Sequence, residues 1–178
     1  MSSARRALMA GALVSFLAAG ASAVDGVLEI NQACVDTGCF PGDAPGLPVV
    51  INRDLPGSYR LTSTLQVGDP DVAGIEIHDD HVTLDLNGFA ITGPTVCGGI
   101  GSGLQCAPLG TGIGIHAVPT TRTGISVRNG IVRGMPSTGV FLGAEADVQG
   151  LLVVGNGGPG ISVAGRSLVA GCRVTRNM

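Results

Sequence analysis

Acidic and imidazole side chains gather in one short run of the sequence, His78-Asp79-Asp80-His81, and Asp85 follows it within a predicted strand. Carboxylates grouped in this way are ligands that Ca²⁺ takes in proteins, and paired acids can supply the general acid and base of glycoside hydrolysis. Asp79, Asp80, His81 and Asp85 are therefore candidate catalytic residues, and Asp79 with Asp80 is a candidate calcium site. The alternative is a turn between two strands, in which the aspartates bond their own backbone and the histidines face water.

Arginine and amide side chains form a second group. Asn87, Arg128 and Gln149 occupy corresponding positions of three similar segments, and Arg133 and Arg173 lie on nearby predicted strands. Side chains stacked one strand apart, about 4.8 Å, make a polar ladder that can follow a sugar chain, and arginine can grip a uronate in bidentate fashion. These five residues are candidate glycan-binding residues. An ordinary solvated strand face would have the same composition.

Four of the five cysteines form two closely spaced pairs, Cys34 with Cys39 and Cys97 with Cys106. Each pair can close a short loop. Structural zinc sites usually contain Cys-x-x-Cys spacings, which neither pair has, so the sequence favours two disulfides over a metal site. Cys172 is left over, and its apolar neighbours in the repeat described below predict a small core residue.

The first 23 residues have the features of a secretory signal peptide. Arg5 and Arg6 precede an uncharged apolar run from Ala7 to Ala19, and small residues at a cleavage site end at Ala23. Cleavage near Ala23 predicts a secreted or periplasmic protein, in a compartment where disulfides persist. The apolar run is shorter than the roughly 20 residues of a membrane-spanning helix, and no later segment comes close, so no membrane span is expected.

Composition excludes several classes of function. Lysine is absent, which removes the phosphate loop of nucleotide-binding proteins. Acidic residues outnumber basic residues by 13 to 10, so a nucleic-acid partner is not expected. Glycine supplies 30 of 178 residues and hydrophobic residues 44%, while only 3% are aromatic. This composition predicts short aliphatic strands separated by glycine turns.

A repeat of 21 residues organises the second half of the chain. Segments that begin at Val127, Val148 and Val169 share apolar first and sixth positions, and a segment from Leu86 matches them. One predicted inward column contains Ile91, Val132, Val153 and Val174, and another contains Phe89, Gly130, Leu151 and Cys172. A second repeated motif consists of a glycine, an apolar residue, a variable residue and another apolar residue. It begins at Gly139 and Gly160, and earlier copies begin at Gly74 and Gly112. So short and glycine-rich a period predicts an all-β solenoid whose coils stack through parallel backbone hydrogen bonds.

Three segments, Pro56–Leu61, Val82–Phe89 and Arg128–Gly134, resemble exported bacterial right-handed parallel β-helix proteins of the pectate-lyase-like superfamily. The resemblance covers residues 45–177 and implies a right-handed parallel β-helix of about five coils with an N-terminal cap. That superfamily contains lyases, hydrolases and adhesins, so the resemblance specifies the fold more than the chemistry. The Asn-Thr-Asp, Gly-His-Gly and Arg-Ile-Lys motifs of its galacturonan hydrolases are absent from this sequence.

We therefore expect a signal peptide over residues 1–23, a cap over residues 24–47 with the Cys34–Cys39 disulfide, and a β-helix over residues 48–178. An inserted loop over residues 94–111 would carry the Cys97–Cys106 disulfide. Asn177 corresponds to Asn156, which a further turn and coil follow, so we expect the sequence to be part of a longer protein.

The expected function is that of a non-catalytic surface, matrix or carbohydrate-binding module with polysaccharide as its partner and no cofactor. The alternative is a polysaccharide lyase or glycoside hydrolase that acts on acidic polysaccharide. Calcium is expected as a cofactor only for the lyase, because lyases of the superfamily use calcium-binding acids with an arginine or lysine base.

Overall fold

The computed structural model describes residues 26–52, 57–99 and 101–178, so the predicted signal peptide lies outside the described residues. Within these ranges the chain is nearly all-β, with one short α-helix and one 3-10 turn. The helix is α1 (Gln32–Val35) and the turn is η1 (Gly101–Gly103). The strands are β1 (Leu28–Ile30), β2 (Val49–Ile51), β3 (Ser58–Leu61), β4 (Leu65–Gln66), β5 (Ile75–Ile77), β6 (Thr83–Asp85), β7 (Ala90–Thr92), β8 (Val96–Gly98), β9 (Gln105–Ala107), β10 (Ile115–Ala117), β11 (Ser126–Arg133), β12 (Val140–Leu142), β13 (Asp147–Val154), β14 (Ile161–Val163), β15 (Leu168–Ala170) and β16 (Arg173–Thr175).

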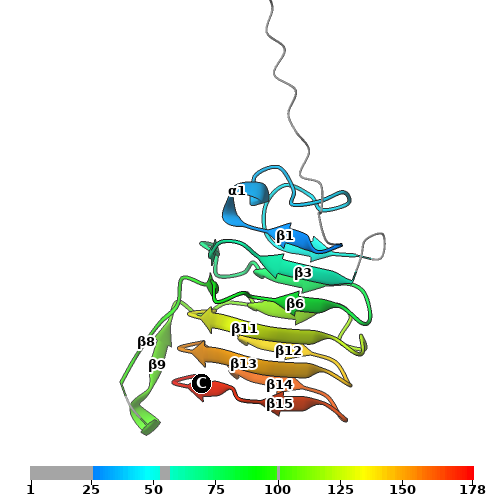
Figure 1. The fold of residues 1–178 in the computed structure, drawn as a ribbon. Coiled ribbons are helices and arrows are strands. Elements are labelled where there is room, and N and C mark those ends of the chain that lie inside the picture. The colour runs from blue at the N-terminus through cyan, green and yellow to red at the C-terminus, as the bar shows by residue number, and fades with distance from the viewer. Residues whose placement is uncertain (1–25, 53–56, 100) are drawn as a thin grey trace, which may run out of the picture.

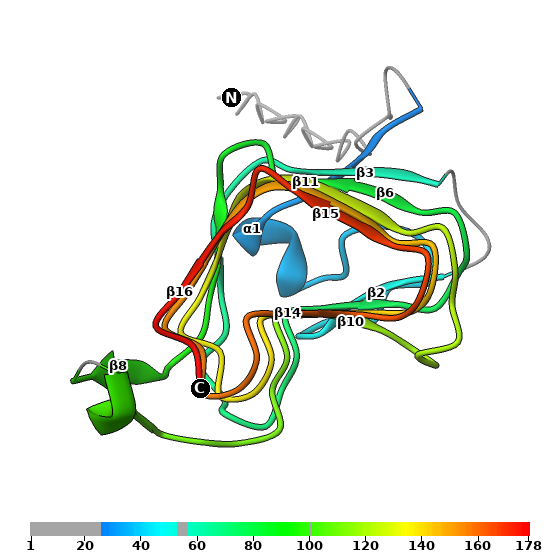
Figure 2. The ribbon, with the colours of Figure 1, turned by 90° about the horizontal axis from the view of Figure 1, so that it is seen from below.

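Most strands belong to two parallel sheets that face each other across one core. Sheet A has nine strands, with β1-β3-β6-β11-β13-β15 in order. The second halves of β11 and β13 pair with β7 and β16, and β4 pairs with β7. Sheet B has five strands in the order β14-β12-β10-β5-β2. Figure 1 shows the strands stacked from the blue end of the chain to the red end, and Figure 2 shows sheet A bending around two sides of the core while sheet B closes the third. This arrangement is compatible with a β-solenoid.

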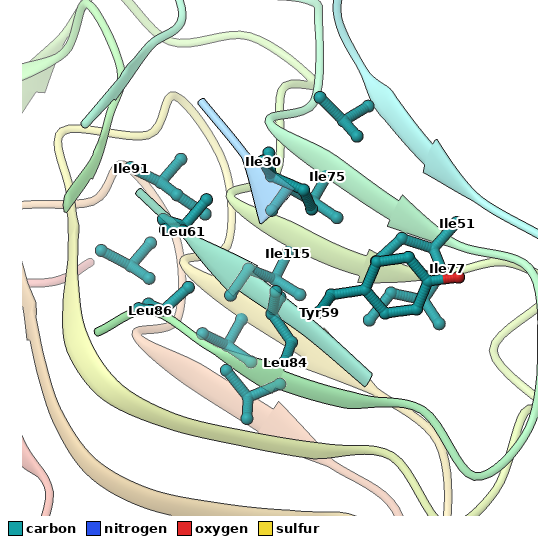
Figure 3. Close-up of a cluster of buried hydrophobic side chains, with 14 of the residues drawn as sticks. Ile30, Ile51, Tyr59, Leu61, Ile75, Ile77, Leu84, Leu86, Ile91 and Ile115 are labelled. Carbon is teal, nitrogen blue, oxygen red and sulfur yellow. The ribbon is translucent and has the colours of Figure 1, made fainter. Parts of the chain in front are cut away.

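Strand register confirms the first predicted inward column. Val132 pairs with Ile91 and Val153, and Val153 pairs with Val174. Ile91, Val132 and Val153 are fully buried, whereas Val174 on the last strand is 48% exposed. Figure 3 shows Leu61 and Leu84 from sheet A and Ile75 and Ile115 from sheet B pointing into the same interior. Repeating an apolar position once per coil therefore builds a continuous core.

The predicted alignment of Leu86 with Val127 is wrong by two residues, because Leu84 is the residue that pairs with Val127. Four residues separate Asp85 from Ala90, whereas two separate Arg128 from Ile131, the partner of Ala90. The additional residues form a wider corner, in which Asn87 and Gly88 both have positive φ, at 50° and 80°. A pattern of apolar positions does not reveal that one corner is longer than the next.

A column of glycines precedes four of the five strands of sheet B, namely β5, β10, β12 and β14. The register places Gly114 rather than the predicted Gly112 in line with Gly74, because Ile115 pairs with Ile75. A Cβ on Gly139 would lie 2.6 Å from the carbonyl oxygen of Gly160 and 2.7 Å from Cγ1 of Val153. Glycine is required here because the backbone passes so close to the next coil and to the inward column.

Asparagine side chains link successive corners of the chain. Asn156 lies in the corner after β13, and Asn177 lies in the corresponding corner after β16. Asn156 is fully buried, accepts a hydrogen bond from the backbone N–H of Met135 at 2.8 Å, and donates one from Nδ2 to Oδ1 of Asn177 at 2.8 Å. The 21-residue spacing of Asn156 and Asn177 thus has a structural cause, since each amide satisfies buried polar groups of the adjoining coil.

Both predicted disulfides are present, Cys34–Cys39 beside α1 and Cys97–Cys106 between β8 and β9. Asn31 caps α1 by accepting the backbone N–H of Cys34 at 3.0 Å, and β1 pairs with β3 as a further strand of sheet A. Strands β8 and β9 form an antiparallel hairpin inside the predicted insertion, and the hairpin projects from the stack in both views (Figures 1 and 2). Arg176 donates to the carbonyl oxygen of Cys97 at 3.1 Å, which ties the hairpin to the last coil.

Cys172 is the one cysteine outside these disulfides in the described part of the chain, and it packs partly buried against the core, as predicted. Within the same ranges, no helix has the length and apolar character needed to cross a membrane.

Candidate functional site

The predicted acidic cluster lies in the corner between β5 and β6. Asp80 accepts the backbone N–H of Thr123 at 2.8 Å through Oδ1, and its Oδ2 lies 3.6 Å from Nη1 of Arg122. Asp79 accepts the backbone N–H of Asp80 at 2.9 Å. These are the contacts of a turn, and they tie the corner to the next coil.

His81 in the same corner has a positive φ of 58° and an exposed side chain, and its backbone N–H donates to the carbonyl oxygen of Thr123 at 3.0 Å. No group of three or more His, Cys, Asp or Glu side chains among residues 26–52, 57–99 and 101–178 is placed to hold a metal ion. The catalytic roles of Asp79, Asp80 and His81, and the calcium site, stay predictions.

The predicted glycan-binding residues are only partly brought together. Register aligns Arg60, Asp85, Arg128 and Gln149 on the outer face of sheet A, and we name these four the charged row. Asp85 Oδ2 lies 3.1 Å from Nε of Arg128, and Gln149 donates to both carboxylate oxygens of Asp147 at 2.8 and 2.9 Å. Within this row Asp85 pairs with Arg128, whereas Gln149 binds Asp147, which lies outside the row.

Asn87 does not join the charged row, because it turns the corner after β6. Its backbone N–H donates to Asp85 at 2.8 Å and its side chain donates to the carbonyl oxygen of Leu61 at 3.3 Å. Arg133 and Arg173 are exposed on the β7–β16 side of sheet A, where Arg133 donates to Oγ1 of Thr92 at 3.1 Å. The three arginines and two amides thus do not form one surface.

A different set of side chains meets on the outer face of sheet B. Each strand there has two inward residues flanking one outward residue, as in Ile75-Glu76-Ile77, because side chains alternate along a strand. The outward residues align across the sheet by register. In order they are Val50, Glu76, His116, Phe141 and Ser162, which we name the sheet B row.

The centre of the sheet B row, together with the adjoining His78, combines a carboxylate, two imidazoles and an aromatic ring. His116 and Phe141 stack with ring centroids 5.7 Å apart and planes within 4°. Next to them, Nε2 of His78 lies 3.0 Å from Oε2 of Glu76. Glu76 and His78 remain 27% and 37% exposed, so solvent and ligands reach both groups.

Burial lowers the pKa of His116 below the usual range of histidine. The Glu76 carboxylate opposes this shift in pKa, and His78 adds to it by repulsion between two positive charges. His116 is therefore mostly neutral at neutral pH, and its imidazole offers one donor and one acceptor. With the Glu76 carboxylate alongside, the row presents hydrogen-bonding groups next to an apolar ring.

Sequence reasoning missed this site because Glu76 and His116 are far apart along the chain, with the hairpin between them. The signal was present in the second repeated motif, because the second residue after each column glycine is the one that points outward. With Gly114 aligned on Gly74, that position contains Glu76, His116, Phe141 and Ser162 in turn.

No family model matches the chain, and neither a curated protein nor a solved structure matches it.

Proposed function

We propose that the protein is an exported, non-catalytic carbohydrate-binding module that binds polysaccharide on the sheet B row. We further propose that its scaffold is a right-handed parallel β-helix of the pectate-lyase-like type, with about five coils and an N-terminal cap. The parallel register of both sheets and the five strands of sheet B support the coils. The path of the chain in Figure 2 supports the handedness, since it turns counterclockwise as it approaches the viewer toward its red end.

The observation that carries the proposal is the stacked pair of His116 and Phe141 beside the Glu76–His78 hydrogen bond. A sugar ring presents an apolar face to an aromatic side chain while its hydroxyls bond to polar groups at the rim. His116 lies on one side of Phe141 in the row and the small Ser162 lies on the other. A sugar can therefore approach the ring over Ser162 and reach the imidazole and carboxylate groups farther along.

Two observations favour binding without turnover. The sheet B row contains one carboxylate, whereas glycoside hydrolysis generally uses two on opposite sides of the scissile bond. The carboxylates predicted from the sequence, Asp80 and Asp85, are engaged by backbone N–H groups and by arginines. These contacts stabilise corners and strands.

Retention in native gels containing polysaccharide tests the binding. We expect at least one polysaccharide to retard the protein. Phe141→Ala should weaken its binding about threefold to tenfold, which is the contribution of one aromatic contact. Arg128→Ala is the matched control on the charged row and should be retarded like the parent protein. Loss of retention in Arg128→Ala with full retention in Phe141→Ala would assign binding to the charged row and refute the proposal.

One observation favours the enzymatic alternative, a lyase or hydrolase of acidic polysaccharide. A carboxylate hydrogen-bonded to an imidazole, as Glu76 is to His78 at 3.0 Å, is an arrangement that orients a general base. Incubation with polygalacturonate and alginate, with and without calcium, followed by detection of new double bonds and reducing ends, separates the two functions. We expect no product; product that is lost in His78→Gln would establish the enzyme.

A further inference from the structure

The charge of the sheet B row depends on two histidines and one carboxylate. Val50, Phe141 and Ser162 carry no charge, so the ionisable side chains of the row are Glu76, His116 and the adjoining His78. At the β2 edge the carboxylate of Asp43 accepts the backbone N–H of Val50 at 2.8 Å. Charged groups on the flanking corners occur as pairs, Arg122 with Asp80 at 3.6 Å and Arg166 with Glu145 at 2.7 Å. The negative charge of Asp79, also in the corner after β5, helps to raise the pKa of Tyr59 on the other sheet.

Protonation of its imidazoles makes the row more positive. Histidine is the side chain that ordinarily gains a proton between neutral and mildly acidic pH. The row and the adjoining His78 place two imidazoles beside one carboxylate, so protonation of the imidazoles shifts the charge of this surface toward positive values. The burial that lowers the pKa of His116 moves part of this change to a pH below the usual range of histidine.

We propose that the sheet B row binds anionic saccharides, those bearing carboxylate or sulfate groups, in mildly acidic solution and releases them near neutral pH. The proposal rests on the function proposed above, and it adds the class of ligand and the condition for binding.

Three contacts favour an anionic ligand in acid. The imidazolium N–H groups donate charge-assisted hydrogen bonds to carboxylate or sulfate oxygens, which are stronger than bonds between neutral groups. Stacking on Phe141 stabilises protonated His116, because a cation over an aromatic face is attracted to it. The Glu76 carboxylate repels an anionic ligand, and an imidazolium 3.0 Å from it offsets that repulsion.

The test compares retention on polygalacturonate, dextran sulfate and neutral dextran at about pH 5 and about pH 7.5. Polygalacturonate and dextran sulfate separate carboxylate from sulfate recognition, and neutral dextran measures binding that needs no charge. We expect retention on at least one anionic polymer to be about tenfold stronger in acid, and retention on dextran to change little.

Four variants distinguish protonation of the sheet B row from the loss of negative charge that the whole protein undergoes in acid. His78→Gln and His116→Gln should each reduce the gain in acid to about threefold or less. His81→Asn, a change at the exposed corner histidine to a residue that tolerates its positive φ, should keep the full gain. Glu76→Gln should retain anionic polymer more strongly than the parent protein near neutral pH, because the repelling carboxylate is gone.

Two outcomes overturn different claims. Binding of anionic polymer that is equal at both pH values, or a gain in acid that persists in His78→Gln and His116→Gln, refutes the inference and leaves the proposed function standing. Absence of retention on every polysaccharide at both pH values refutes the proposed function, and the inference with it.

Discussion

Tyr59 shows how the core controls the ionisation of a single residue. It is the only tyrosine of the chain, it is 2% exposed, and its ring packs against Phe40 with centroids 5.4 Å apart. Burial, and in second place the negative charge of Asp79, raise the pKa of Tyr59 to about 12. The folded protein therefore favours the neutral phenol, whereas the unfolded chain ionises near its ordinary value.

This difference predicts an alkaline transition. The stability that Tyr59 contributes is fully present below the unfolded pKa of about 10 and is lost as pH rises through the folded pKa near 12, because the unfolded chain releases its proton first. We expect the phenolate absorbance of the native protein to stay low through about pH 10 and to rise near pH 12 as structure is lost. The same titration in denaturant, where the phenol should ionise near pH 10, is the control. Ionisation of the native protein near pH 10 would contradict the buried position.

For single residues, the sequence predicted those contacts that follow from a regular spacing along the chain. The disulfide pairs and the inward column of Ile91, Val132 and Val153 depend on local spacing, and the structure confirms them. Glu76 and His116 become neighbours only through strand register, which depends on the whole path of the chain between them. Composition and spacing do not determine that path.

Among the elements, the glycine column fixes how closely sheet B approaches the coil beside it. Gly139→Ala places a methyl group within 2.6 Å of a backbone carbonyl and 2.7 Å of Val153, neither of which can move without disturbing a strand. We expect the free energy of unfolding to fall by about 2 kcal/mol, measured by urea denaturation.

Gly165→Ala is the matched control for this prediction. Its φ lies outside the left-handed region, and a Cβ there meets no atom within 4 Å. We expect a change of about 0.5 kcal/mol or less. Equal destabilisation by Gly139→Ala and Gly165→Ala would show that close approach is not the reason for the column.

The lengths of the corners explain why the strands could be predicted from the sequence more accurately than their alignment with one another. Nearly all elements of the described residues are strands, as the alternation of apolar residues predicted, and the hairpin of β8 and β9 lies within residues 94–111. The corner from Leu86 to Phe89 contains two more residues than the corresponding corner of β11, and its positive φ values at Asn87 and Gly88 accommodate them. This difference in length moved Asn87 out of the charged row and brought Asp85 into it.

For the whole molecule, stacked coils turn positions far apart in the sequence into continuous rows on each outer face. The outer face of sheet A carries opposite charges that pair with one another, such as Asp85 with Arg128 at 3.1 Å. The outer face of sheet B carries a ring, two imidazoles and a carboxylate that remain partly accessible. The repeat predicted that rows would exist, and only the register shows which row combines groups suited to a sugar.

Side-chain NMR during titration with polysaccharide fragments tests the proposed binding face most directly, because the two outer faces carry different reporter groups. We expect the ring signals of His116 and Phe141 to shift or broaden as fragments are added in mild acid, while the Arg128 guanidinium and the Gln149 amide stay unchanged. The opposite pattern, with Arg128 and Gln149 perturbed and the His116 and Phe141 rings unaffected, would contradict carbohydrate binding on sheet B.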